Sequence, residues 1–156
     1  MKPIYIDGDV REPIGDGNKI IIHCCNDIFV FGAGVALSIK NKWPEACIKY
    51  KEWGVKSDVK LGDVQFVMVE KDIAVGNMIA QHGIYNQGNI PPIRYEALNT
   101  ALIKVHNKAK KHNASIHLPY KMCCGLAGGD WAIVEDLIMK NLCDKEIEVK
   151  IYRFKG

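Results

Sequence analysis

Two stretches of the chain share one pattern of apolar and polar positions. Each has an apolar run, a loop with closely spaced glycines, and a segment whose apolar residues recur at helical spacing. The first extends from Ile20 to Trp43 and contains Gly32-Ala33-Gly34; the second extends from Leu118 to Ile133 and contains Gly125-Leu126-Ala127-Gly128-Gly129. Glycines between a strand and a helix let backbone N–H groups approach an anion. The pattern therefore predicts one anionic ligand held between two strand ends.

Strand and helix patterns alternate through the rest of the chain. We expect strands at Lys2–Ile6, Lys19–Cys24, Asp63–Glu70, Asp72–Gln81, Ser115–Pro119 and Glu146–Phe154. We expect helices from Gly34 to Trp43, Glu45 to Trp53 (ending at Gly54), Arg94 to His112 and Asp130 to Leu142. This mixture predicts an α/β fold, a three-layer α/β/α sandwich with a mixed central sheet, as one domain over residues 1–156. The segment Ile84–Pro92 is polar, rich in Gly, Asn and Pro, and expected to be a mobile loop.

Composition narrows the class of protein. Hydrophobic residues make up 48% and charged residues 25% of the 156 residues, as in ordinary globular domains. The net charge of +3 is small, and its clearest local source is the predicted end of one helix, at Lys104, Lys108, Lys110 and Lys111. No basic-aromatic module stands out, so nucleic acid is not indicated as a partner. No apolar run is long enough to cross a membrane.

Six cysteines are present, and four of them form the adjacent pairs Cys24-Cys25 and Cys123-Cys124 at two predicted strand ends. The first residues carry Asp7 and Asp9 and no apolar export signal, so we expect a cytoplasmic protein with reduced thiols. Zinc between the two pairs is conceivable with His23 nearby. Vicinal cysteines are poorly placed to chelate one ion, so no metal is expected.

The first glycine loop partly matches the dinucleotide fingerprint. Leu37 stands at the third glycine position, and seven residues separate Cys24 from Gly32 where the fingerprint needs a tight turn. A dinucleotide-binding oxidoreductase is therefore an alternative that these two departures oppose. No phosphate-binding loop of the Walker A type is present.

Several motifs together resemble the macrodomain family. They are Gly8-Asp9-Val10, Asn26 ahead of Gly32-Ala33-Gly34-Val35-Ala36, Asn77-Met78-Ile79-Ala80-Gln81, Tyr95-Glu96-Ala97-Leu98 and the stretch from Cys124 to Trp131. The likeness covers nearly the whole chain and is closest to the small stand-alone branch of Appr-1″-p processing proteins, to which the terminal ADP-ribose hydrolases are related. It implies ADP-ribose or a derivative as ligand, no cofactor, and no membrane partner. A monomer is the simplest expectation.

The resemblance also implies roles for residues. Asp9 and Val10 would contact adenine; Gly32, Ala33, Gly34 and Val35 would hold the pyrophosphate and distal ribose; Gly125, Leu126, Ala127, Gly128, Gly129 and Trp131 would face them; Asn26, Asn77 and Gln81 would complete the site. Plainer alternatives exist for single residues. Asp9 suits a turn, Asn26 a strand end, His23 a packed interior, and Asp130 the N-cap of a helix.

Chemistry is harder to assign. The catalytic lysine of the terminal ADP-ribose hydrolases falls on Gln81 or His82, and their assisting aspartate on Ala127, so that mechanism is not expected. A water-based hydrolysis or phosphatase step could use Asp130, Asn26 and His23, or His82. The leading hypothesis is hydrolysis of a 1″-phosphate or an ester-linked ADP-ribosyl protein at the distal ribose. The alternative is an ADP-ribose reader without turnover.

Overall fold

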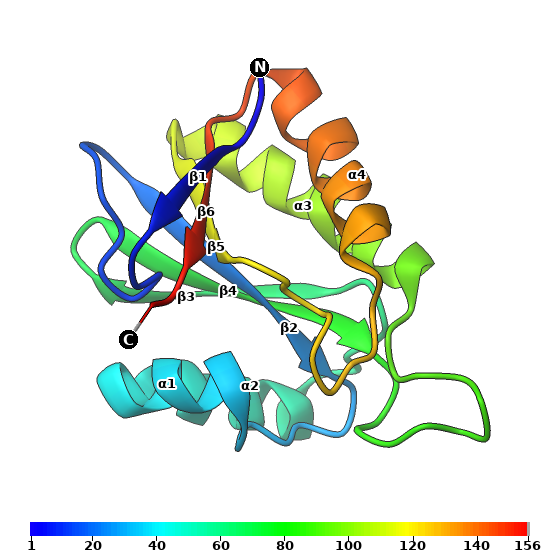
Figure 1. Ribbon diagram of the computed structural model, residues 1–156. Coiled ribbons are helices and arrows are strands. Elements are labelled where there is room, and N and C mark those ends of the chain that lie inside the picture. The colour runs from blue at the N-terminus through cyan, green and yellow to red at the C-terminus, as the bar shows by residue number, and fades with distance from the viewer. Residues whose placement is uncertain (156) are drawn as a thin grey trace.

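The chain folds into three layers with a sheet in the middle. The computed structural model describes residues 1–155. Helices α1 (Gly34–Lys42) and α2 (Pro44–Lys56) cover one face of a six-stranded sheet, and α3 (Tyr95–His112) and α4 (Trp131–Asn141) cover the other (Figure 1). The predicted α/β/α sandwich with a mixed sheet is confirmed.

The sheet is parallel except for one edge strand. Its order is β1-β6-β5-β2-β4-β3, and only β3 runs antiparallel, to β4. The strands are β1 (Ile4–Asp7), β2 (Lys19–Asn26), β3 (Val64–Glu70), β4 (Ile73–Gln81), β5 (Ser115–Pro119) and β6 (Val149–Arg153). Because β2 lies between β4 and β5, the carboxyl ends of these three strands meet at one edge. Ligands of open parallel sheets bind at this edge.

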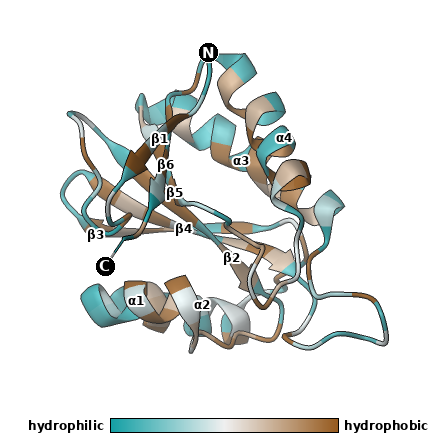
Figure 2. Cartoon of the chain, in the orientation of Figure 1, coloured by the Kyte–Doolittle hydropathy of each residue, from teal (hydrophilic) through white to brown (hydrophobic). Residues whose placement is uncertain are grey.

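Two apolar cores lie on opposite faces of the sheet. Alternate residues of β2 point to opposite faces, so Ile21 packs under α1 and α2 while Ile22 packs under α3 and α4. Hydrophobic colouring is densest along the strands, and the outer faces of the helices are largely polar (Figure 2). The central strands β2 and β4 are buried almost throughout, which explains their nearly continuous apolar sequences.

The element boundaries differ from prediction in a few places. Strand β2 continues to Asn26. Strand β6 begins later than expected because Glu146, which follows the 3₁₀ turn η1 (Cys143–Lys145), has a left-handed φ of 64° and not an extended one. Helix α2 does not end at Gly54. A Cβ at that position would lie 2.5 Å from the Phe29 ring, so the glycine makes room for an aromatic side chain instead of ending the helix. Among residues 1–155, no helix is both long and apolar enough to cross a bilayer.

Candidate functional site

A cavity of about 560 Å³ opens at the carboxyl ends of β2, β4 and β5. The first loop, residues 27–33 together with the start of α1, forms one wall. The second loop, residues 120–129, forms the other. Gln81, Ile84 and Tyr85 line the cavity after β4. The two glycine loops therefore line one space, where the sequence predicts an anionic ligand.

The Asn26 side chain folds the first loop. Its Oδ1 accepts hydrogen bonds from the N–H groups of Ile28 and Val30 at 3.2 and 3.0 Å, and its Nδ2 donates to the Val30 carbonyl at 2.8 Å. The side chain is buried, although the residue also lines the cavity. With these three bonds, Asn26 has a structural task that the sequence reasoning gave only as its plainer alternative.

Beyond this loop, α1 begins without a cap. Its N-cap residue Ala33 offers no side-chain oxygen, and the first turn carries no acidic residue. Helical geometry leaves the first N–H groups, from Gly34 to Ala36, without intrahelical acceptors. A Cβ placed on Gly32 or Gly34 would meet no described atom within 4 Å. The start of α1 therefore presents free donors and a positive helix end to the cavity.

The second loop is held by its own chain. Gly129 donates its N–H to the Cys123 carbonyl at 2.8 Å, and Gly128 donates to Gly125 at 3.0 Å. A Cβ on Gly128 would lie 2.6 Å from Pro91, and one on Gly129 would lie 2.5 Å from the Cys123 oxygen. These two predicted ligand residues therefore lie outside the cavity lining and keep the loop closed, whereas Gly125, Leu126 and Ala127 line it.

Asp130 caps α4 instead of lining the cavity. Its Oδ1 accepts the N–H of Ala132 at 2.9 Å, and its own N–H donates to the Tyr95 hydroxyl at 2.9 Å. Trp131 packs edge-on against Tyr120 with ring centroids 5.3 Å apart, and it does not line the cavity either. Asp130 therefore caps α4, and the residue is exposed to solvent.

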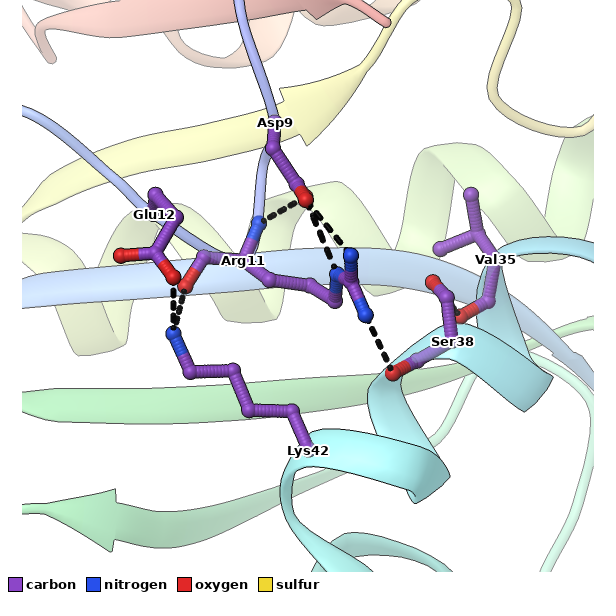
Figure 3. A network of polar contacts seen from close by, with 6 residues as sticks. All are labelled: Asp9, Arg11, Glu12, Val35, Ser38 and Lys42. Atoms are coloured by element: carbon purple, nitrogen blue, oxygen red, sulfur yellow. Dashed lines mark hydrogen bonds and ion pairs between the residues drawn. The ribbon is translucent and has the colours of Figure 1, made fainter. Parts of the chain in front are cut away.

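Asp9 lies in a charged cluster beside α1 (Figure 3). Arg11 pairs with it through two guanidinium nitrogens at 2.7 and 3.1 Å, and the same guanidinium reaches the Ser38 carbonyl of α1 at 3.5 Å. The hydrogen bond from Arg11 lowers the pKa of the Asp9 carboxyl, so it stays ionised at neutral pH. The Val10 side chain is buried in the core under α1 and α2. Neither residue lines the cavity.

His23 and Asn77 form a buried pair beneath the first loop, and of the two only His23 lines the cavity. Asn77 Oδ1 can only accept, so His23 Nε2 donates to it over 2.6 Å. Burial lowers the pKa of His23 to about 4, which leaves the ring neutral. Its edge packs on Phe31 at 5.3 Å between centroids. Asn77 is fully buried and bonds Gln65 through Nδ2, so it does not reach the cavity.

The sequence did not indicate that two polar residues just beyond the ends of β2 and β4 form a pair, and neither of them lines the cavity. Asp27 follows Asn26, His82 follows Gln81, and Asp27 Oδ2 accepts from His82 Nδ1 at 2.6 Å. Asp27 Oδ1 also accepts the Gly83 N–H at 2.8 Å. The His82 side chain is 47% exposed. These residues come together because β2 pairs with β4, and the sequence did not indicate that pairing.

Five further residues line the cavity but belong to no motif that the sequence analysis identified: Phe31, Ile84, Tyr85, Tyr120 and Lys121. Lys121 supplies an ammonium group, which lies 5.7 Å from the Tyr120 ring centroid. Ala127 is 4% exposed and has no titratable group.

The cysteines correct one expectation. Cys24 and Cys123 form a disulfide across 99 residues of sequence, with Cα atoms 5.6 Å apart, so the expectation of six reduced thiols is wrong for this pair. Cys25, Cys47, Cys124 and Cys143 are free. Within residues 1–155, no three His, Cys, Asp or Glu side chains come together as a metal site.

Comparisons with known proteins agree with this architecture. No family model matches the chain. The mouse chromodomain-helicase-DNA-binding protein 1-like is 31% identical over 163 residues, which include 96% of this chain but only 17% of that protein. The chain therefore spans about a sixth of the length of this curated relative.

Solved structures match over the whole chain. A Bacteroides thetaiotaomicron protein of unknown function has a TM-score of 0.95 and 44% identity, covering 98% of both chains. The Thermosipho africanus DarTG in complex with ADP-ribose shares the fold, with a TM-score of 0.71 and 20% identity over 86% of this chain and 37% of that chain. A macrodomain protein from Streptomyces coelicolor has a TM-score of 0.85 and 41% identity, covering 97% of this chain and 98% of its own. With a cavity between two glycine loops and a relative this similar over its full length, the chain belongs to the macrodomain family.

Proposed function

We propose that the cavity binds ADP-ribose or a derivative, with the diphosphate at the start of α1. The observation that carries this is the uncapped helix end, with free N–H groups beside glycines whose missing side chains leave open space. Such an end favours a phosphate group. The volume of about 560 Å³ suits a ligand of this size. Support also comes from the DarTG structure, which has the same fold and contains ADP-ribose.

We further propose that the site hydrolyses a group from the distal ribose, either a 1″-phosphate or an ester-linked ADP-ribosyl protein. His82, which directly follows the lining residue Gln81, is the base we propose. Since Asp27 accepts from Nδ1, the neutral ring keeps an unprotonated Nε2, and the half-exposed side chain can reach water. His23 lines the cavity but is only 2% exposed and its Nε2 is bonded to Asn77, and Asp130 is engaged as a cap. Neither is as free to accept a proton.

The proposed step needs only water as co-reactant. His82 Nε2 would take a proton as the water oxygen attacks the phosphorus or the ester carbonyl. The bond from that atom to the ribose oxygen then breaks. The proton returns to the departing ribose oxygen, giving ADP-ribose and either phosphate or a free carboxyl group. Asp27 would hold the ring in this orientation.

Thermal shift tests the binding claim. A ligand at a hundredfold excess over its Kd stabilises by about 2.7 kcal/mol, so ADP-ribose should raise Tm clearly. ADP supplies the control that lacks the distal ribose, and NADH tests the dinucleotide alternative. A larger shift with NADH than with ADP-ribose would favour the oxidoreductase.

Turnover tests the chemistry. The substrates are ADP-ribose 1″-phosphate, O-acetyl-ADP-ribose and mono-ADP-ribosylated peptides. His82→Gln and Asp27→Asn should lower the rate by about a hundredfold with binding retained, since general bases contribute about 10²–10⁴-fold. Asp130→Asn, which still caps, serves as the matched control and should keep full turnover. Binding without turnover of any substrate would leave the reader function in place of the enzyme.

A further inference from the structure

Cys24 and Cys123 join the two walls of the cavity. Both residues line it, and their disulfide links the carboxyl end of β2 to the start of the second loop. Cys24 is partly exposed and Cys123 is 8% exposed. Because the first loop begins at the end of the same β2 strand, the disulfide adds a covalent link between the strand that leads into the first loop and the second loop.

The second loop depends on Cys123 in two further ways. The Cys123 carbonyl accepts the Gly129 N–H, which closes the loop. The residue also adopts φ of +68°, a left-handed conformation that residues other than glycine rarely take. A change at Cys123 should therefore move Gly125, Leu126 and Ala127, the residues of this loop that face the ligand.

The neighbouring cysteines cannot replace this pair. Cys124 does not line the cavity, its thiol donates to the Met122 carbonyl at 3.3 Å, and burial raises its pKa. Cys25 lines the cavity but is only 3% exposed and belongs to the core on the opposite face of the sheet, and burial raises its pKa well above the usual value. Both therefore stay protonated, poorly nucleophilic thiols at neutral pH. Exchange at the disulfide has to come from a small thiol that enters the cavity.

We propose that Cys24 and Cys123 form a redox latch in the ligand cavity, closed in the disulfide state and open in the dithiol state. Two small thiols of the glutathione class supply two electrons and two protons: the S–S bond breaks, Cys24 and Cys123 become thiols, and the small thiols leave as their own disulfide. The disulfide state holds the loops at the spacing the ligand needs. This inference rests on the proposed ADP-ribose site.

Disulfide formation and ligand binding are thermodynamically coupled, so the latch can be tested by measuring either one. If the disulfide favours ligand binding, bound ligand must favour the disulfide by the same factor. The ligand also fills the space through which a thiol would approach. ADP-ribose should therefore shift the equilibrium toward the disulfide in a glutathione buffer.

The experiment equilibrates the full chain in glutathione buffers, traps thiols by alkylation and counts them by intact mass. The oxidised protein should show four thiols and the reduced protein six, since the chain has six cysteines and one disulfide. ADP-ribose affinity is then measured in each state. We expect binding to be about tenfold weaker in the reduced state, within the usual range of coupling between sites.

Cys24→Ala and Cys123→Ala should bind ADP-ribose as weakly as the reduced protein, and reductant should not change their affinity. Cys124→Ala, the matched neighbour, should behave as wild type. Six thiols in oxidised glutathione, or equal affinities in both states, would overturn the latch. If neither state binds ADP-ribose, the proposed function fails. Hydrogen exchange then decides the latch alone: residues 121–129 should be protected only in the disulfide state, and equal exchange would reject it.

Discussion

The two glycine loops share one sequence pattern but meet their helices differently. The first leads into α1 with no side-chain cap, so its N–H groups are free for a ligand. The second leads into α4, where Asp130 caps the helix and Gly128 and Gly129 pack against their own chain. Glycine therefore leaves open space beside the helix start in the first loop and serves mainly chain packing in the last part of the second. The same pattern carries different functions because the neighbouring side chains differ.

The largest expected effect is at the first loop. Gly32→Val puts a branched side chain into open space, and Gly32 has no left-handed φ that would strain the fold. Blocking two or more phosphate hydrogen bonds, at about 1.5–3 kcal/mol each, should weaken ADP-ribose at least about a hundredfold. Calorimetry measures the loss, and Tm confirms folding. Ser57→Val, in exposed extended backbone, is the control. Unchanged affinity would remove the first loop from the site.

The second-largest expected effect is a loss of stability at acid pH through His23, which packs beneath the first loop. The pKa of His23 is about 4 in the folded state because of burial, below the unfolded value of about 6.5. The unfolded chain binds more protons between these values, so stability is full above pH 6.5 and falls as pH drops toward 4, by about 3 kcal/mol for this group. Urea unfolding across this range should show a shallower pH slope in His23→Gln than in wild type. Identical slopes would mean that His23 does not contribute.

His117 provides a comparison away from both loops. Burial lowers its pKa to about 3, and it bonds Ser115 and Tyr152 in the middle of the sheet, outside the cavity lining. His117→Gln should therefore reduce the pH slope of stability without changing how ADP-ribose affinity depends on pH.

A smaller effect is expected at the second loop. A Cβ on Gly125 also meets no described atom within 4 Å, and the residue lines the cavity. Gly125→Val should weaken ADP-ribose by about tenfold, roughly 1.4 kcal/mol, because this loop shapes the cavity without a free helix end behind it. A loss as large as that of Gly32→Val would show that the two loops contribute equally.

The smallest effect concerns the cap. Asp130→Ala should lower the free energy of unfolding by about 1 kcal/mol and leave ADP-ribose affinity unchanged. Asp130→Asn should restore stability, because asparagine caps about as well. Chemical unfolding and calorimetry on the same samples separate the two readouts. Reduced affinity in Asp130→Asn would return this residue to the ligand site.

The fold and the location of the site follow from local patterns. Strand β5 was predicted with its observed bounds, and the two glycine loops were expected at one ligand because the carboxyl ends of parallel strands share an edge. These features depend on periodicity and on glycine spacing, which are properties of short segments.

The finer chemistry depends on contacts between distant segments. The Asp27–His82 pair requires the pairing of β2 with β4, and the Cys24–Cys123 bond requires the second loop to lie over β2. Gly54 misled the prediction of α2, because its reason is the Phe29 ring and not a helix end. The sequence was equally consistent with Asp130 as a helix cap and as a residue facing the ribose, and only its hydrogen bond with Ala132 identifies the cap.

A crystal structure of the protein with ADP-ribose tests the central claim most directly. We predict the diphosphate at the N–H groups of Gly34 to Ala36, with Gly125 to Ala127 on its other side. A second cavity of about 580 Å³ at the opposite end of the sheet, lined by Asn18, Asn113 and Ser115 among others, provides the internal comparison and should stay empty. Ligand in that cavity, or none between the glycine loops at a saturating concentration, would contradict the account.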